Sequence, residues 1–102
     1  IERFEATWLI VSAGFDGHRN DPLAGLQLTS ADFADLAERL RQLVADRRLV
    51  VGLEGGYDLD ALRMSTGATL SALVGEGYRP EEASTGEIGV PVITAAKQLW
   101  DL

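Results

Sequence analysis

The pattern of apolar and polar positions predicts two short buried strands with an amphipathic helix between them. Residues 7–13 read TWLIVSA and Leu49–Leu53 read LVVGL, two nearly continuous apolar runs that are rich in strand-forming residues. Such runs are typical of strands in a parallel sheet with both faces covered. Between them, residues of about 31–47 follow a helical period after an N-cap at Thr29 or Ser30. The apolar positions of this helix are Phe33, Leu36, Leu40, Leu43 and Val44.

The second half of the chain predicts two further helices separated by an irregular segment. The apolar positions of the first are Leu59, Leu62, Leu70, Leu73 and Val74. Gly75 and Gly77 follow them and end this helix, as glycine commonly does. Residues 76–91 are polar and include prolines, so we expect no regular structure there. The last short helix is indicated by Ile93, Ala96, Leu99 and Trp100.

The order strand, helix, strand, helix predicts an α/β fold, with a parallel sheet as the middle of three layers. A right-handed crossover would join the strands. Both strands then point the same way, so the loops that follow them, residues 14–28 and 54–58, share one edge of the sheet. Ligand sites of α/β folds lie at this edge. We therefore expect Asp16 and Tyr57 to lie near each other.

Asp16 and His18 stand in the glycine-rich loop that follows the first strand. The sequence GFDG places Asp16 in a turn, where a carboxylate serves either as a turn cap or as a metal ligand or general base. Asp16 and His18 spell Asp-x-His, but alternate residues reach one ion only from an extended segment. We therefore expect His18 to be a partly exposed loop histidine rather than a ligand.

Gly55, Gly56 and Tyr57 form a second candidate segment after the second strand. Two glycines let the backbone approach a ligand closely and adopt a positive φ. A tyrosine at this point can donate its hydroxyl to a developing oxyanion, or bond to nearby backbone as a structural residue. The glycine spacing fits neither a dinucleotide fingerprint nor a phosphate loop.

Length, net charge and cysteine content limit the kinds of function that this chain can have. The chain has 102 residues, enough for one small domain, and a net charge of −7, which disfavours binding to a phosphate backbone. It has neither a signal-peptide pattern nor an apolar run that approaches the roughly 20 residues of a membrane span. The absence of cysteine fits a reducing compartment, so we expect a cytoplasmic protein. A start at isoleucine leads us to expect a piece of a longer chain.

Two stretches resemble the histone deacetylase superfamily. Val11–Leu36, with VSAGFDGHRNDPLAGLQL, is similar to the segment that carries the third zinc ligand of these enzymes. Val50–Leu62, reading VVGLEGGYDLDAL, is similar to the segment of their catalytic tyrosine. The two motifs also occur in the order and at about the spacing of the family. The presence of Glu54 before the two glycines resembles the class II branch of the family. The resemblance implies the C-terminal part of a single deacetylase domain with the arginase/deacetylase-type fold, whose motifs cover residues 7–75, with a less informative tail over 76–102.

Carried over by position, the resemblance implies that Asp16 binds Zn²⁺ and that Tyr57 polarises the scissile carbonyl. Gly55 and Gly56 would line the acyl-lysine channel. Leu23 would lie at its mouth, where an apolar residue suits acyl-lysine better than a cationic acetylpolyamine. The partners implied are an acetylated lysine or polyamine substrate and the rest of the parent chain.

The resemblance also implies ligands and catalytic histidines that this chain does not supply, since a catalytic zinc site needs three protein ligands. We therefore expect the isolated piece to be inactive. Because its two strands would lose their neighbours in the parent sheet, we also expect it to associate with itself or to be marginally stable. Two alternatives remain open: an acetylpolyamine or acetoin-utilisation deacetylase with the same chemistry, and a non-catalytic α/β module for assembly or binding.

Overall fold

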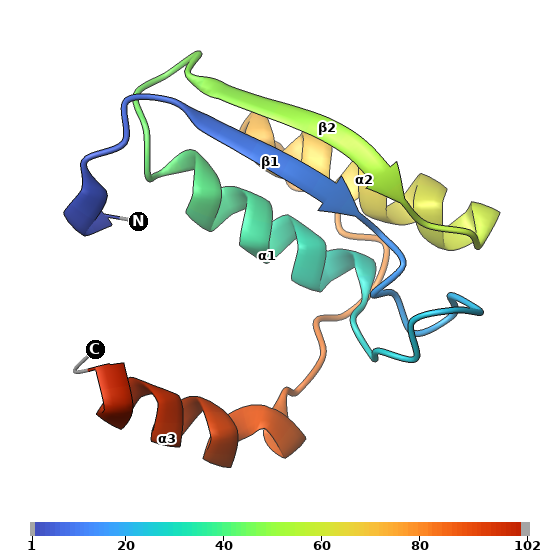
Figure 1. The fold of residues 1–102 in the computed structure, drawn as a ribbon. Coiled ribbons are helices and arrows are strands. Elements are labelled where there is room, and N and C mark those ends of the chain that lie inside the picture. The colour runs from blue at the N-terminus through green and yellow to red at the C-terminus, as the bar shows by residue number, and fades with distance from the viewer. Residues whose placement is uncertain (1, 101–102) are drawn as a thin grey trace.

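The computed structural model describes residues 2–100, which form a two-stranded sheet and three α-helices (Figure 1). The strands are β1 (Leu9–Gly14) and β2 (Leu49–Gly55). The α-helices are α1 (Ser30–Arg41), α2 (Leu59–Leu73) and α3 (Val90–Trp100). Two short 3-10 helices are η1 (Glu2–Phe4) and η2 (Glu87–Gly89). None of the helices within residues 2–100 has the length and apolar character that crossing a bilayer requires.

The strands are parallel, which confirms the α/β arrangement predicted from the element order. They pair in register from Leu9 with Leu49 to Ala13 with Leu53. The register then shifts, so Gly14 pairs with Gly55 and Glu54 is the extra residue on β2. This irregularity lies at the carboxyl edge of the sheet, directly before both candidate loops.

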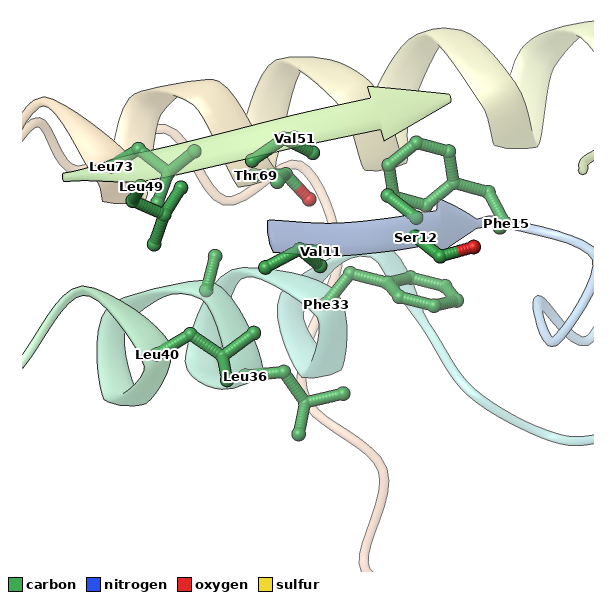
Figure 2. Close-up of a pocket in the computed structure, with 13 residues that line it drawn as sticks. Val11, Ser12, Phe15, Phe33, Leu36, Leu40, Leu49, Val51, Thr69 and Leu73 are labelled. Carbon is green, nitrogen blue, oxygen red and sulfur yellow. The ribbon is translucent and has the colours of Figure 1, made fainter. Parts of the chain in front are cut away.

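Helices α1 and α2 pack against each other on one face of the sheet (Figure 1). The buried cluster between them consists of alanines, whose small side chains let the two helices approach closely: Ala34, Ala37, Ala68 and Ala72. Between β1, β2 and these helices lies a cavity of about 170 Å³, lined by side chains such as Val11, Val51 and Leu40 (Figure 2). The covered face of the sheet is therefore incompletely filled.

The opposite face of the sheet is exposed within residues 2–100. Ile10 is 78% exposed and Val50 is 49% exposed, although both are apolar strand residues. Helix α3 does not cover them, because it contacts mainly η2 and stands apart from the sheet (Figure 1). We expected helices on both faces; the described residues supply the sheet and one helical layer.

Two predicted boundaries were wrong. Helix α1 ends at Arg41 rather than at residue 47, because the chain must turn before β2. Arg47 has a φ of 67°, and the N–H of Arg48 donates to the carbonyl of Ala45, so this segment is a tight turn. Helix α3 begins at Val90, within the segment expected to be irregular, and holds Pro91 in its first turn, where proline needs no hydrogen-bond partner.

Candidate functional site at the carboxyl edge of the sheet

The end of β1 fixes the backbone on which Asp16 stands. The N–H of Phe15 donates to the carbonyl of Gly55 at 2.9 Å, which ties the loop after β1 to the end of β2. Phe15 is 4% exposed, and its ring meets Phe33 edge to face with centroids 5.1 Å apart. Asp16 follows this anchor as a half-buried residue. The two candidate loops therefore meet at one edge of the sheet, as parallel strands predict.

The carboxylate of Asp16 lies against the glycines that end both strands. A Cβ atom on Gly55 would be 2.8 Å from Oδ1 of Asp16, and one on Gly14 would be 2.6 Å from the same oxygen. Real Cβ atoms essentially never approach other atoms this closely, so a side chain at either position would displace the carboxylate. This contact joins Asp16 to the Gly-Gly-Tyr segment directly.

Tyr57 stands between a glycine turn and the start of α2. Gly56 has a φ of 126°, and a Cβ there would approach Leu62 at 3.1 Å, so this position also requires glycine. Tyr57 itself is 62% exposed. Directly after it, the Asp58 carboxylate accepts the N–H of Ala61 at 2.7 Å and caps the helix.

Asp21 is a second acidic residue of the site, and it stands directly before Pro22, in a dipeptide that ordinarily marks only a turn. It is 8% exposed, and its carboxylate accepts the N–H groups of Leu23 and Tyr57, each at 2.8 Å. Burial raises the pKa of Asp21, but these backbone donors outweigh it and lower the pKa below the ordinary value of 3.8. Leu23 is 70% exposed, on the outer part of the same loop.

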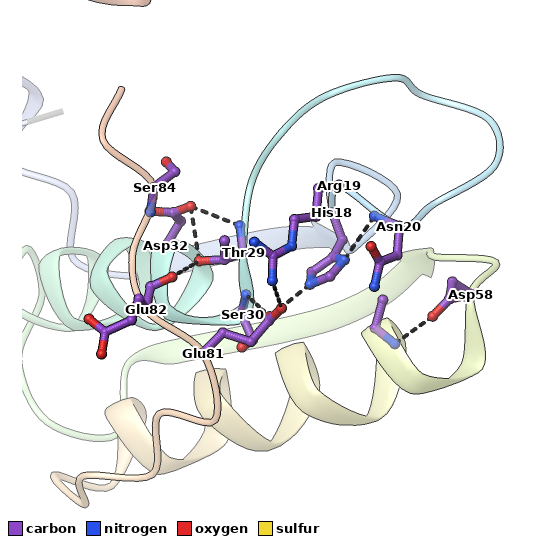
Figure 3. A network of polar contacts seen from close by, with 11 residues as sticks. His18, Arg19, Asn20, Thr29, Ser30, Asp32, Asp58, Glu81, Glu82 and Ser84 are labelled. Carbon is purple, nitrogen blue, oxygen red and sulfur yellow. Dashed lines mark hydrogen bonds and ion pairs between the residues drawn. The ribbon is translucent and has the colours of Figure 1, made fainter. Parts of the chain in front are cut away.

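The expectation of a partly exposed His18 was wrong, since its exposure is 0%. Its Nε2 lies 2.8 Å from Oε2 of Glu81, and its Nδ1 accepts the N–H of Asn20 at 3.2 Å (Figure 3). Because Nδ1 is an acceptor, the ring proton is on Nε2 and is donated to Glu81. Both ring nitrogens are thus engaged, Nδ1 by the loop and Nε2 by the tail segment, so His18 is not free to bind a metal.

Glu81 is the residue that holds this loop, and no sequence signal indicated it. Its carboxylate also binds the Arg19 guanidinium and the N–H of Ser30, both at 2.8 Å (Figure 3). Burial raises the pKa of Glu81, but the donors from His18 and Ser30 prevail and lower it to about 2. The tail segment, which carries little of the family resemblance, therefore binds the candidate loop and the start of α1.

A catalytic zinc centre needs three protein ligands that converge on one ion. Within residues 2–100, no three acidic, histidine or cysteine side chains converge on one point. Asp16 fits as a single carboxylate ligand, since no described residue donates a hydrogen bond to its oxygens and carboxylate oxygen is an ordinary zinc ligand. The residues described here can contribute one ligand to a metal centre.

Comparisons with known proteins identify the family of this chain. Residues 1–73 match the histone deacetylase domain family. The chain is 46% identical over 78 residues to Histone deacetylase 10, chloroplastic, of Oryza sativa subsp. japonica, a match that covers 74% of this chain and 18% of that protein. It is 39% identical over 77 residues to Polyamine deacetylase HDAC10 of Homo sapiens, over 76% of this chain and 11% of that protein.

A solved structure gives the same result for the fold. The HDA15 HD domain matches with a TM-score of 0.71 and 29% identity, over 98% of this chain and 28% of that one. The chain spans a minor part of the length of each of these relatives. With the family match over most of the sequence and the fold in agreement, the chain belongs to the histone deacetylase family.

Proposed function

We propose that this chain contributes a zinc-ligand carboxylate, Asp16, and an oxyanion-stabilising phenol, Tyr57, to a zinc-dependent deacetylase. Residues 1–102 would form the C-terminal part of one deacetylase domain, with the site in residues 7–75. The observation that carries the proposal is the contact of the Asp16 carboxylate with Gly55, two positions before Tyr57. The zinc ion and the oxyanion donor both act on the same amide carbonyl. A residue that binds the zinc must therefore lie close to the oxyanion donor.

Each residue then has a distinct task in amide hydrolysis. Asp16 would occupy one coordination position of the zinc ion. When bound, zinc supplies Lewis-acid polarisation of the carbonyl. Tyr57 donates its hydroxyl hydrogen to the oxyanion that develops on that carbonyl. Gly55 and Gly56 would line the acyl-lysine channel with their backbone. The remaining ligands and the proton-transferring histidines come from other parts of the deacetylase domain.

The substrate class we propose is an acetylated lysine side chain. Leu23 supports it, because an exposed apolar residue at the channel mouth suits the methylene chain of acetyl-lysine. An acetylpolyamine is the second candidate, and similarity to a human protein named a polyamine deacetylase favours it. Steady-state kinetics with an acetyl-lysine peptide and with acetylspermidine, on the complete protein that contains this chain, separates the two.

The experiment that tests the activity is Tyr57→Phe in that complete zinc-loaded protein. We expect kcat for the acetyl-lysine peptide to fall on the order of a hundred- to a thousand-fold, because one oxyanion donor is lost. Bound zinc should remain at the wild-type level, since Tyr57 is not a ligand.

Tyr78→Phe is the matched control. Tyr78 is the other of the two tyrosines, and its ring lies beside Gly67 on α2. We expect kcat near the wild-type value for this variant. Unchanged kcat in Tyr57→Phe, together with unchanged zinc in Asp16→Asn, would instead identify a non-catalytic module.

A further inference from the structure

The Asp21 carboxylate joins the loop of Asp16 to the segment of Tyr57. Its two oxygens have different partners: Oδ1 accepts the N–H of Leu23 and Oδ2 accepts the N–H of Tyr57, each at 2.8 Å. The contact with Tyr57 spans 36 positions of sequence, so it is a tertiary contact and not part of the local turn. A carboxylate that is 8% exposed and bonded in this way is held firmly.

This hydrogen bond falls where the backbone before Tyr57 would otherwise have the most freedom. Gly55 and Gly56 precede it, and glycine restricts φ and ψ less than any other residue. After Tyr57, the Asp58 cap fixes the first turn of α2. Within the described residues the Tyr57 hydroxyl has no hydrogen-bond partner, and its side chain is 62% exposed. The position of the phenol therefore depends on how its backbone is anchored.

We propose that Asp21 is a positioning residue that acts through Tyr57: it fixes the backbone of the tyrosine so that the hydroxyl reaches the developing oxyanion. The same carboxylate holds the N–H of Leu23, so one side chain sets both the catalytic tyrosine and the residue at the channel mouth. This inference rests on the proposed function of Tyr57. In this proposal Asp21 acts only through the backbone of Tyr57 and Leu23.

Asp21→Asn is the change that addresses this role most directly. The amide keeps the size of the side chain but presents an NH₂ group to one of the two N–H donors, so one hydrogen bond is replaced by a repulsive contact. A displacement of about 1 Å at a catalytic group can cost on the order of a hundred-fold in rate. We therefore expect the Tyr57 segment to shift while the loop of Asp16, anchored by Phe15 and Glu81, stays in place.

The test is a double-mutant cycle of Asp21→Asn and Tyr57→Phe in the complete zinc-loaded protein. In the wild-type background, Asp21→Asn should lower kcat by about ten- to a hundred-fold, with a smaller change in KM and unchanged zinc content. In the Tyr57→Phe background the same change should lower kcat by less than about threefold, because the hydroxyl that Asp21 positions is already absent.

Asp32→Asn is the matched control. Asp32 also accepts backbone N–H groups, from Thr29 at 2.8 Å and Ser84 at 3.0 Å, but it has no contact with the Tyr57 segment. Its effect on kcat should be small and equal in both backgrounds. If Asp21→Asn does not yield folded protein, Asp21→Glu enters the same cycle, since it moves the acceptor oxygens by one methylene and keeps the charge.

The outcomes distinguish the two proposals. An equal loss from Asp21→Asn in both backgrounds, or no loss in the wild-type background, overturns the positioning role while Tyr57 remains the oxyanion donor. Full kcat in Tyr57→Phe overturns the function proposed for Tyr57, and the role of Asp21 falls with it. A loss confined to the background that retains the tyrosine hydroxyl supports both.

Discussion

Gly55 illustrates how a residue without a side chain is fixed by its neighbour. Its backbone pairs with Gly14 in the sheet, and the Asp16 carboxylate occupies the space that a Cβ would need. The backbone cannot withdraw without breaking the pairing of the strands. Any side chain at this position must therefore displace the carboxylate.

From this geometry we expect Gly55→Ala to lower zinc affinity in the complete protein. The new methyl group would begin 2.8 Å from Oδ1 of Asp16, so the proposed ligand must move. Zinc retained after dialysis against a weak chelator measures the loss, and far-ultraviolet circular dichroism checks the fold. Gly52→Ala is the control, since a Cβ on Gly52 meets nothing within 4 Å. Equal zinc retention in the two variants would contradict the proposed role of Asp16 as a zinc ligand.

Glu81 determines how this region responds to acid. Its pKa is lowered from 4.5 to about 2, so the ionised form is favoured in the folded state. Stability from a lowered carboxylate pKa is fully present above the unfolded value and is lost as the pH falls through the folded value. The window for Glu81 therefore runs from about pH 4.5 down to about pH 2.

Glu81→Gln should remove this dependence in the complete protein. We expect the free energy of unfolding at pH 7 to fall by about 1–3 kcal/mol, since a neutral amide weakens the bonds to His18 and Ser30 and cannot accept from Arg19 with its NH₂ group. Its slope between pH 4.5 and 2 should flatten. Urea unfolding at several pH values measures both effects. Glu82→Gln is the control, because Glu82 uses only its backbone carbonyl, towards Thr29, and should behave as wild type.

At the scale of elements, the strands and their shared edge could be predicted because buried parallel strands leave contiguous apolar runs. The end of α1 could not, since Leu43 and Val44 keep helical spacing and are half-buried while they lie beyond the helix. Helical periodicity reports burial on one side, and a turn that packs against the same core produces the same pattern.

The candidate site was predicted in part for a related reason. Asp16 and Tyr57 could be placed together because each follows a strand, and strand order determines which loops meet. The role of His18 could not be predicted, because its partner Glu81 lies 63 positions away in a segment without periodicity. The contact of Asp21 with Tyr57 could not be predicted either, since it joins positions 36 residues apart and depends on tertiary structure.

Within residues 2–100 the molecule is a two-stranded sheet with helices on one face. Each strand has one neighbour within residues 2–100, so each also has an unpaired edge, and the apolar face that includes Ile10 is exposed. Unpaired edges and large apolar patches promote association between chains. Parallel sheets ordinarily have both faces covered by helices, and here one face is open.

We therefore expect the isolated 102-residue polypeptide to self-associate. Size-exclusion chromatography with light scattering, over a series of concentrations, should give a mass that rises above the monomer value of 11.0 kDa. Ile10→Lys should reduce the association by placing a charge on the exposed face. A monomer at all concentrations for the unmodified polypeptide would contradict this expectation.

The separation of His18 from Glu81 also orders events while the chain is being made. Domains emerge from the ribosome starting at the N-terminus, so the loop of Asp16 appears long before Glu81 is synthesised. Until then the His18 ring and the N–H of Ser30 lack the carboxylate that they share in the finished structure. The nascent loop must therefore remain hydrated, and it takes its final form only when the segment around Glu81 has left the exit tunnel.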